Sequence, residues 1–80
     1  MTHEKKIRGL VCAVLGNPEC MTVGIDSDLQ FLGMDSLNCV RLIIAIEEEF
    51  VIEISEDKIG VRYINTIERI QELIKEAAAK

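Results

Sequence analysis

The stretch that decides the fold spans residues 32–50 and reads LGMDSLNCVRLIIAIEEEF. From Ser36 onwards its apolar side chains recur at the spacing of an α-helix. Asp35 and Ser36 carry short oxygen-bearing side chains, which can accept hydrogen bonds from the free backbone N–H groups at the start of a helix. We therefore predict a helix that begins at Asp35-Ser36 and ends at Phe50.

This predicted helix has two apolar faces. The first covers roughly one third of the circumference, the width that a helix packed on a core needs, and comprises Cys39, Leu42, Ile43, Ile46 and Phe50. The second lies more than a quarter turn away and comprises Leu37, Val40 and Ile44. A compact apolar strip with Arg41, Glu47 and Glu48 beside it is typical of a protein-docking surface. The alternative is a central helix whose apolar residues are all buried.

Helical periodicity also marks the two ends of the chain. It predicts a first helix whose apolar stripe is Ile7, Leu10, Val11, Val14 and Leu15, followed by a stop at Gly16. It predicts a last helix whose apolar stripe is Ile67, Ile70, Leu73, Ile74 and Ala77. Asn65 to Glu68 fits a capping box, with the acceptor first and the glutamate three residues later. Lys5, Lys6 and Arg8 are expected on solvated faces.

The segments between these helices complete the predicted fold. Residues 17–35 form a long loop in which Leu29, Phe31 and Leu32 pin a short turn. Residues 51–54 alternate in polarity but have no second strand to pair with, and Ser55-Glu56-Asp57 indicates a short helical turn. The sequence thus predicts one domain, residues 1–80, with an all-α fold: a small four-helix bundle of three main helices and one short helix, with a long loop between helices one and two.

Composition and charge exclude several classes of function. Net charge is -5, and residues 25–57 hold nine acidic side chains against one base, Arg41. This negative field repels nucleic acid and anionic membranes and attracts proteins with basic patches. The longest apolar run, residues 42–46, is far too short to span a membrane. No export signal is recognisable, so we expect a cytoplasmic protein.

The cysteines and the single histidine do not form a recognisable metal or catalytic motif. Cys12, Cys20 and Cys39 are widely spaced and odd in number, which favours reduced thiols used as small hydrophobic residues. With only His3 available, a zinc site would need all three thiols to converge. No metal site is predicted.

Ser36 is the strongest candidate for a chemically functional residue. At a helix N-terminus, its hydroxyl lies where backbone N–H groups and the helix dipole favour a negative group such as a phosphodiester. The alternative is an ordinary N-cap. A hydrolase is excluded because the GxSxG pattern is absent and His3 is the only histidine that could serve as a base.

These residues together resemble the acyl carrier protein family. The resemblance rests on LGMDSL at residues 32–37, on AIEEEF at residues 45–50 and on Glu53-Ile54, at the family's spacing, with Val40, Leu42 and Ile43 between them. It covers essentially the whole chain, from the first helix and long loop to residues 65–70 at the start of the last helix.

The resemblance implies a carrier rather than an enzyme. A phosphopantetheinyl transferase would attach 4'-phosphopantetheine to Ser36, with Asp35 helping to position the serine and the transferase's magnesium ion. The arm would carry an acyl group as a thioester. The implied partners are that transferase and acyl-loading and synthase enzymes with basic docking patches, and we expect a monomer. The implied partner-binding residues are Leu37, Val40, Arg41, Ile44, Glu47 and Glu48. The residues implied to shelter an attached chain, which also fit an ordinary core, are Ile43, Ile46, Phe50, Ile59 and Ile67.

Two positions depart from the common fatty-acid carriers. Asn38 stands where those carriers usually have Asp, and Arg41 stands where an acidic residue is usual. These changes favour a dedicated pathway such as polyketide synthesis, whereas the acidic run at residues 47–49 favours fatty-acid synthesis. Two alternatives remain: an aminoacyl or peptidyl carrier of a nonribosomal-peptide-type pathway, and a helical adaptor that binds proteins without a prosthetic group.

Overall fold

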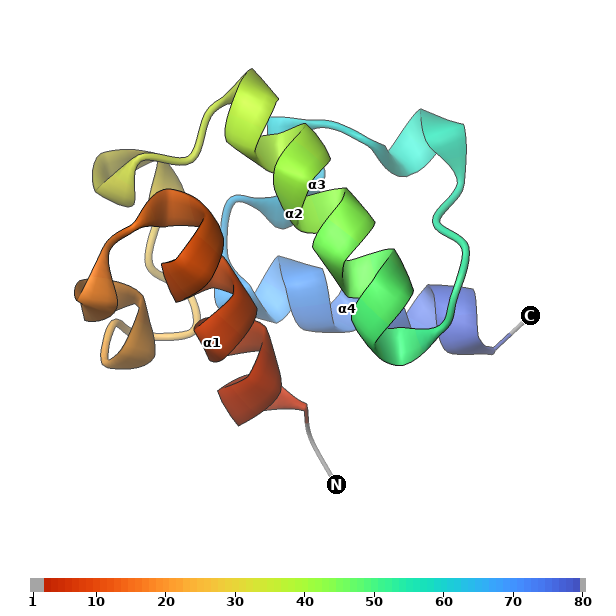
Figure 1. Ribbon diagram of the computed structural model, residues 1–80, viewed down its shortest axis with the longest axis horizontal. Helices are drawn as coiled ribbons and strands as arrows, with labels where there is room; N and C mark the ends of the chain where they lie inside the picture. The colour runs from red at the N-terminus through yellow and green to blue at the C-terminus, as the bar shows by residue number, and fades with distance from the viewer. Residues whose placement is uncertain (1–2, 80) are drawn as a thin grey trace.

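The computed structural model describes residues 3–79, and these residues form a bundle of helices without any strand (Figure 1). The α-helices are α1 (Glu4–Leu15), α2 (Ser36–Phe50), α3 (Val61–Ile64) and α4 (Ile67–Ala78). Three 3₁₀ turns accompany them: η1 (Pro18–Met21), η2 (Leu29–Leu32) and η3 (Glu56–Lys58). This confirms the predicted all-α bundle. No helix within the described range is long and apolar enough to cross a membrane.

The core forms where the apolar faces of the three longer helices meet. Figure 1 shows α4 passing behind α1 and α2, and α1 packs against both α2 and α4. The buried side chains from these helices include Ile7, Val11, Leu42, Ile43, Ile46, Ile67, Ile70, Leu73 and Ile74. Full burial of each such aliphatic side chain contributes about 2 kcal/mol. The predicted core stripes of all three helices are confirmed.

The ends of the helices match one predicted signal, the stop at Gly16, and differ from another, the capping box before α4. Gly16 ends α1 at φ 65°, and its N–H donates to the Cys12 carbonyl oxygen at 2.8 Å. The predicted capping box is wrong by one residue, because the Thr66 hydroxyl oxygen accepts from the Arg69 N–H at 3.0 Å. Asn65 cannot cap α4 because its backbone still has helical angles, φ -80° and ψ -1°, at the end of α3.

The long loop between α1 and α2 is tied to the junction of α3 and α4. The Leu29 N–H donates to the Asn65 carbonyl oxygen at 2.7 Å, and the Glu68 N–H donates to the Ile25 carbonyl oxygen at 2.9 Å. The predicted turn at residues 29–32 is confirmed as η2. The expectation that Phe31 pins it is wrong, since Phe31 is 88% exposed. With three residues per 3₁₀ turn, Leu29 and Leu32 share the inner side and Phe31 projects outward.

The segment after α2 is irregular before it becomes helical again. Val51 ends α2 at φ 53°, and the Ile54 N–H donates to the Glu47 carboxylate at 2.9 Å. The turn predicted from Ser55 is confirmed as η3. The short α-helix itself lies further along, at α3, after Gly60.

Candidate functional site

Ser36 is an exposed residue at the start of α2, and it does not cap the helix. The cap is Asp35, whose Oδ1 accepts a hydrogen bond from the Asn38 N–H at 2.8 Å. Within residues 3–79 the Ser36 hydroxyl makes no hydrogen bond of its own. The N-cap interpretation of Ser36 is therefore wrong, and its hydroxyl remains available for chemistry.

The backbone before Ser36 is held rigidly against α2. The Met34 side chain is buried, and its N–H donates to the Leu29 carbonyl oxygen at 3.0 Å. The Asn38 Nδ2 donates to the Gly33 carbonyl oxygen at 3.0 Å. Gly33 sits at φ 113°, where a side chain would be strained. These contacts fix the position of Ser36 relative to η2.

The Asn38 contact gives a physical reason for one departure noted in the sequence. An aspartate side chain at this position has no N–H group and, when ionised, could not donate to the Gly33 carbonyl oxygen. Sequence analysis missed this role. Only the fold shows that the Gly33 carbonyl lies beside the first turn of α2.

The second apolar face of α2 is exposed, as predicted. Leu37 is 62% exposed, Ile44 51% and Val40 48%. The alternative, in which a central helix buries every apolar residue, is wrong. A folded core gains nothing from these three side chains, so their exposure fits a surface that another protein covers.

The charged residues predicted beside this face differ in their exposure and in their contacts. Arg41 and Glu48 are exposed, and Arg41 forms no ion pair with any residue in the described range. Glu47 is half-buried, and its carboxylate accepts from the Ile54 N–H. Glu47 therefore stabilises the turn after α2 whatever else it contacts.

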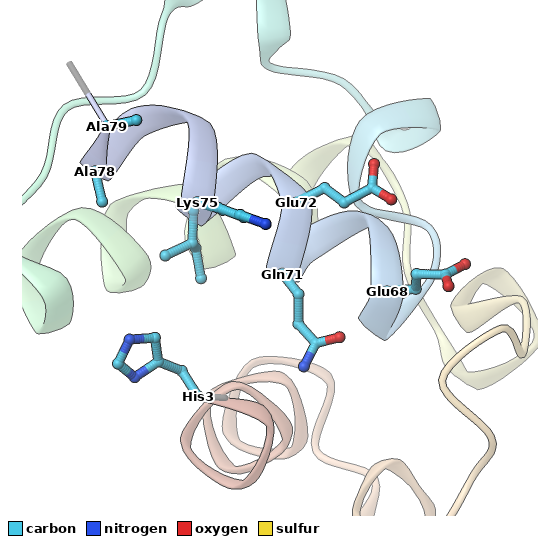
Figure 2. Close-up of a pocket in the computed structure, with 8 residues that line it drawn as sticks. His3, Glu68, Gln71, Glu72, Lys75, Ala78 and Ala79 are labelled. Carbon is cyan, nitrogen blue, oxygen red and sulfur yellow. The ribbon is translucent and has the colours of Figure 1, made fainter. Parts of the chain in front are cut away.

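An open pocket lies between the start of α1 and α4, and Ser36 does not line it. Figure 2 shows His3 on one side of this open pocket of about 700 Å³ and the side chains of α4 on the other. Its lining residues are His3, Glu68, Gln71, Glu72, Ile74, Lys75, Ala78 and Ala79, among which there is no serine, threonine or cysteine nucleophile.

His3 cannot serve Ser36 as a base. Its ring packs edge-on against Phe50, with the ring centroids 4.9 Å apart. Phe50 and Ser36 are the two ends of α2, which is about 20 Å long. His3 and Ser36 therefore do not form a Ser–His pair in this fold.

Cys20 and Cys39 are buried, uncharged packing residues. Burial, followed by the nearby Cys12 thiol, raises the pKa of Cys20 to about 11. Burial also raises the pKa of Cys39. Thiols with raised pKa values are poor nucleophiles and poor metal ligands at neutral pH. Among the residues that the structure describes, no group of three or more His, Cys, Asp or Glu side chains could hold a metal ion.

Comparison with known protein families shows which family the chain belongs to. A family model described as a phosphopantetheine attachment site matches residues 5–76. The chain belongs to this family. An acyl carrier protein of Trieres chinensis is 38% identical over 76 residues, which cover 94% of this chain and 91% of that protein. Acyl carrier protein 2 of Pseudomonas aeruginosa is 36% identical over 75 residues, which cover 92% and 91% of the two chains.

Membership of the phosphopantetheine-binding family gives the chain its prosthetic group, a covalently attached 4'-phosphopantetheine. The residues present fit that group. An arm joined through a phosphodiester needs an exposed hydroxyl and surroundings that tolerate negative charge. Ser36 meets the first need, and the unbonded N–H groups in the first turn of α2 meet the second.

The five residues expected to shelter an attached chain are absent from the linings of the best-defined pockets within residues 3–79. Ile43, Ile46 and Ile67 are almost completely buried, Phe50 is half-buried and Ile59 is 39% exposed. In this conformation they pack as ordinary core or surface residues. Sheltering of cargo therefore stays a prediction.

Proposed function

We propose that the chain carries acyl groups as thioesters on a 4'-phosphopantetheine arm attached to Ser36. The observation that carries the proposal is the exposed Ser36 hydroxyl at the start of α2, left free because Asp35 performs the capping. It is supported by the family match and by relatives that are named acyl carrier proteins.

Attachment of the arm is a substitution at phosphorus. The Ser36 Oγ would form a bond to the phosphorus of coenzyme A that bears the pantetheine group, while the bond from that phosphorus to the oxygen of 3',5'-ADP breaks. The 3',5'-ADP would leave, and the hydroxyl proton would pass to a basic group of the transferase. Asp35 uses Oδ1 for the helix cap. Its other carboxylate oxygen would be free to help position a magnesium ion held by the transferase, and that ion would supply positive charge against the phosphate. Once attached, the arm's terminal thiol supplies the group that forms the thioester.

The carrier role fits the rest of the molecule. The chain would act as one domain, residues 1–80, that serves as substrate and shuttle for other enzymes. The exposed face of Leu37, Val40 and Ile44, with Arg41 and Glu48, would meet loading and synthase enzymes through basic docking patches. The unpaired Arg41 favours a dedicated pathway, such as polyketide synthesis, over general fatty-acid synthesis.

The test is the intact mass after incubation with coenzyme A, magnesium and a broad-specificity phosphopantetheinyl transferase. We expect a gain of one phosphopantetheine in the wild-type chain and none in Ser36→Ala, with both proteins folded by circular dichroism. A wild-type chain that stays unmodified, or a Ser36→Ala variant that gains the arm, would overturn the assignment of Ser36.

The cargo is then tested on the modified chain. We expect loading from acyl donors by an acyl-transferring enzyme and no loading from aminoacyl adenylates. Loading with an amino acid alone would replace the acyl proposal with the aminoacyl or peptidyl carrier. A Ser36→Ala variant that retains its biological activity would instead indicate an adaptor.

A further inference from the structure

Phe31 is the most exposed large hydrophobic residue in the described range. Its side chain is 88% exposed and projects from η2, five residues before Ser36. The fold does not use it, because Leu29 and Leu32 provide the contacts that hold η2 to the core. A phenylalanine exposed to this degree needs a reason outside the folded monomer.

The position of Phe31 relative to Ser36 is fixed. The Met34 N–H donates to the Leu29 carbonyl oxygen, and the Asn38 side chain donates to the Gly33 carbonyl oxygen. These two bonds hold η2 against the first turn of α2. Phe31 therefore lies in the turn that precedes Ser36, and Leu37, which is 62% exposed, follows Ser36 in α2.

The acidic residues near these two side chains in the sequence outnumber the single base, Arg41, which lies one helical turn after Leu37. Residues 25–40 contain Asp26, Asp28 and Asp35 and neither lysine nor arginine. Asp28 and Asp35 are anchored as the N-caps of η2 and α2. A partner that covers this region therefore needs an apolar depression with basic side chains at its rim.

One partner acts on the Ser36 hydroxyl itself. The transferase that installs the arm must bring its own active site to the Ser36 hydroxyl, because reacting atoms have to approach to about 3 Å. It must therefore cover the surface on both sides of that residue.

Resting on the proposed attachment at Ser36, we propose that Phe31 and Leu37 form a two-residue apolar clamp that seats the phosphopantetheinyl transferase over Ser36. Leu37 belongs to the α2 face already described. Phe31 extends recognition onto η2 and acts as a specificity residue for the modifying enzyme.

Val51 provides a matched control for Phe31. It is 87% exposed and apolar, but it lies beyond the opposite end of α2 from Ser36. The experiment measures initial rates of modification of wild type, Phe31→Ser and Val51→Ser by a broad-specificity transferase with fluorescent coenzyme A. Truncation of a central aromatic contact is expected to raise the KM for Phe31→Ser about fivefold or more. We expect kcat to stay within about twofold, and Val51→Ser to match wild type.

Each other outcome has a definite meaning. Equal KM values for Phe31→Ser and Val51→Ser, in chains that are modified, overturn this inference and leave the carrier role intact. A Phe31→Ser defect confined to later transfer of cargo assigns Phe31 to another partner and also overturns the proposal. Failure to modify the wild-type chain overturns both this inference and the proposed function.

Discussion

At the scale of single residues, Val51 has a backbone conformation that is unfavourable for a β-branched side chain. It ends α2 with φ 53° and ψ 52°, the left-handed region, and is the only residue other than glycine with positive φ in the described range. A branched Cβ crowds the following carbonyl oxygen in that conformation. Its side chain is 87% exposed, so packing does not offset the strain.

Val51→Gly should therefore stabilise the protein. Removing the Cβ relieves about 1–2 kcal/mol of strain in the folded protein. Glycine also makes the unfolded chain more flexible, which offsets part of this effect, so we expect the free energy of unfolding to rise by about 1 kcal/mol. Urea denaturation followed by circular dichroism measures the change. Val51→Ala keeps a Cβ and should gain less than Val51→Gly. A Val51→Gly variant less stable than wild type would show that the left-handed turn is not strained.

At the scale of the elements, Arg8 joins α1 to η1. The expectation that Arg8 lies on a solvated face is wrong, because the residue is only 8% exposed. Its Nη1 donates to the Cys20 carbonyl oxygen at 3.0 Å, and its Nε donates to the Glu4 carboxylate at 2.9 Å. The side chain thus satisfies a buried carbonyl at the end of η1, which sequence periodicity could not reveal.

Arg8→Met should lower the free energy of unfolding by about 1–3 kcal/mol, because it fills the space but leaves the buried Cys20 carbonyl without a partner. Thermal and urea denaturation measure this loss. The control is Glu4→Gln, which removes the charge of the part-buried partner of Arg8 but keeps an oxygen that can accept from Nε, and it should cost about 1 kcal/mol or less. Equal losses for the two variants would mean that the ion pair with Glu4, and not the contact with η1, accounts for the contribution of Arg8 to stability.

At the scale of the whole molecule, charge is distributed unevenly along the chain. The nine acids of residues 25–57 fall on the long loop, α2 and the segment after it, and Arg41 is the single base among them. Arg41 is exposed and makes no ion pair within residues 3–79. A partner with a basic patch is therefore attracted to this side of the molecule and locally repelled by Arg41.

Arg41→Glu should speed modification by a transferase with a basic docking patch. We expect kcat/KM to rise about two- to fivefold at low ionic strength, and the difference to vanish when about 0.5 M salt screens exposed charges. Initial rates of phosphopantetheine transfer at both salt concentrations measure the effect. The neutral variant Arg41→Gln should fall between wild type and Arg41→Glu. A slower Arg41→Glu variant at low salt would show that Arg41 meets an acidic group on the partner.

The sequence by itself determined the helices and the family to which the chain belongs. Helical periodicity is a local property, so the stripes of α1, α2 and α4, the stop at Gly16 and the surplus face of Leu37, Val40 and Ile44 could all be read before any fold was known. The spacing of LGMDSL and AIEEEF likewise placed Ser36 in a family that the comparisons confirm.

The tertiary structure alone decided which polar groups find partners across the chain. Asn38 reaches Gly33, Glu47 reaches Ile54, and Arg8 reaches Cys20 because the fold brings these groups together. It also decided that Asp35 and not Ser36 caps α2 and that Phe31 faces solvent. Periodicity cannot supply these answers, since a hydrogen bond depends on distances and angles that exist only after the elements have packed.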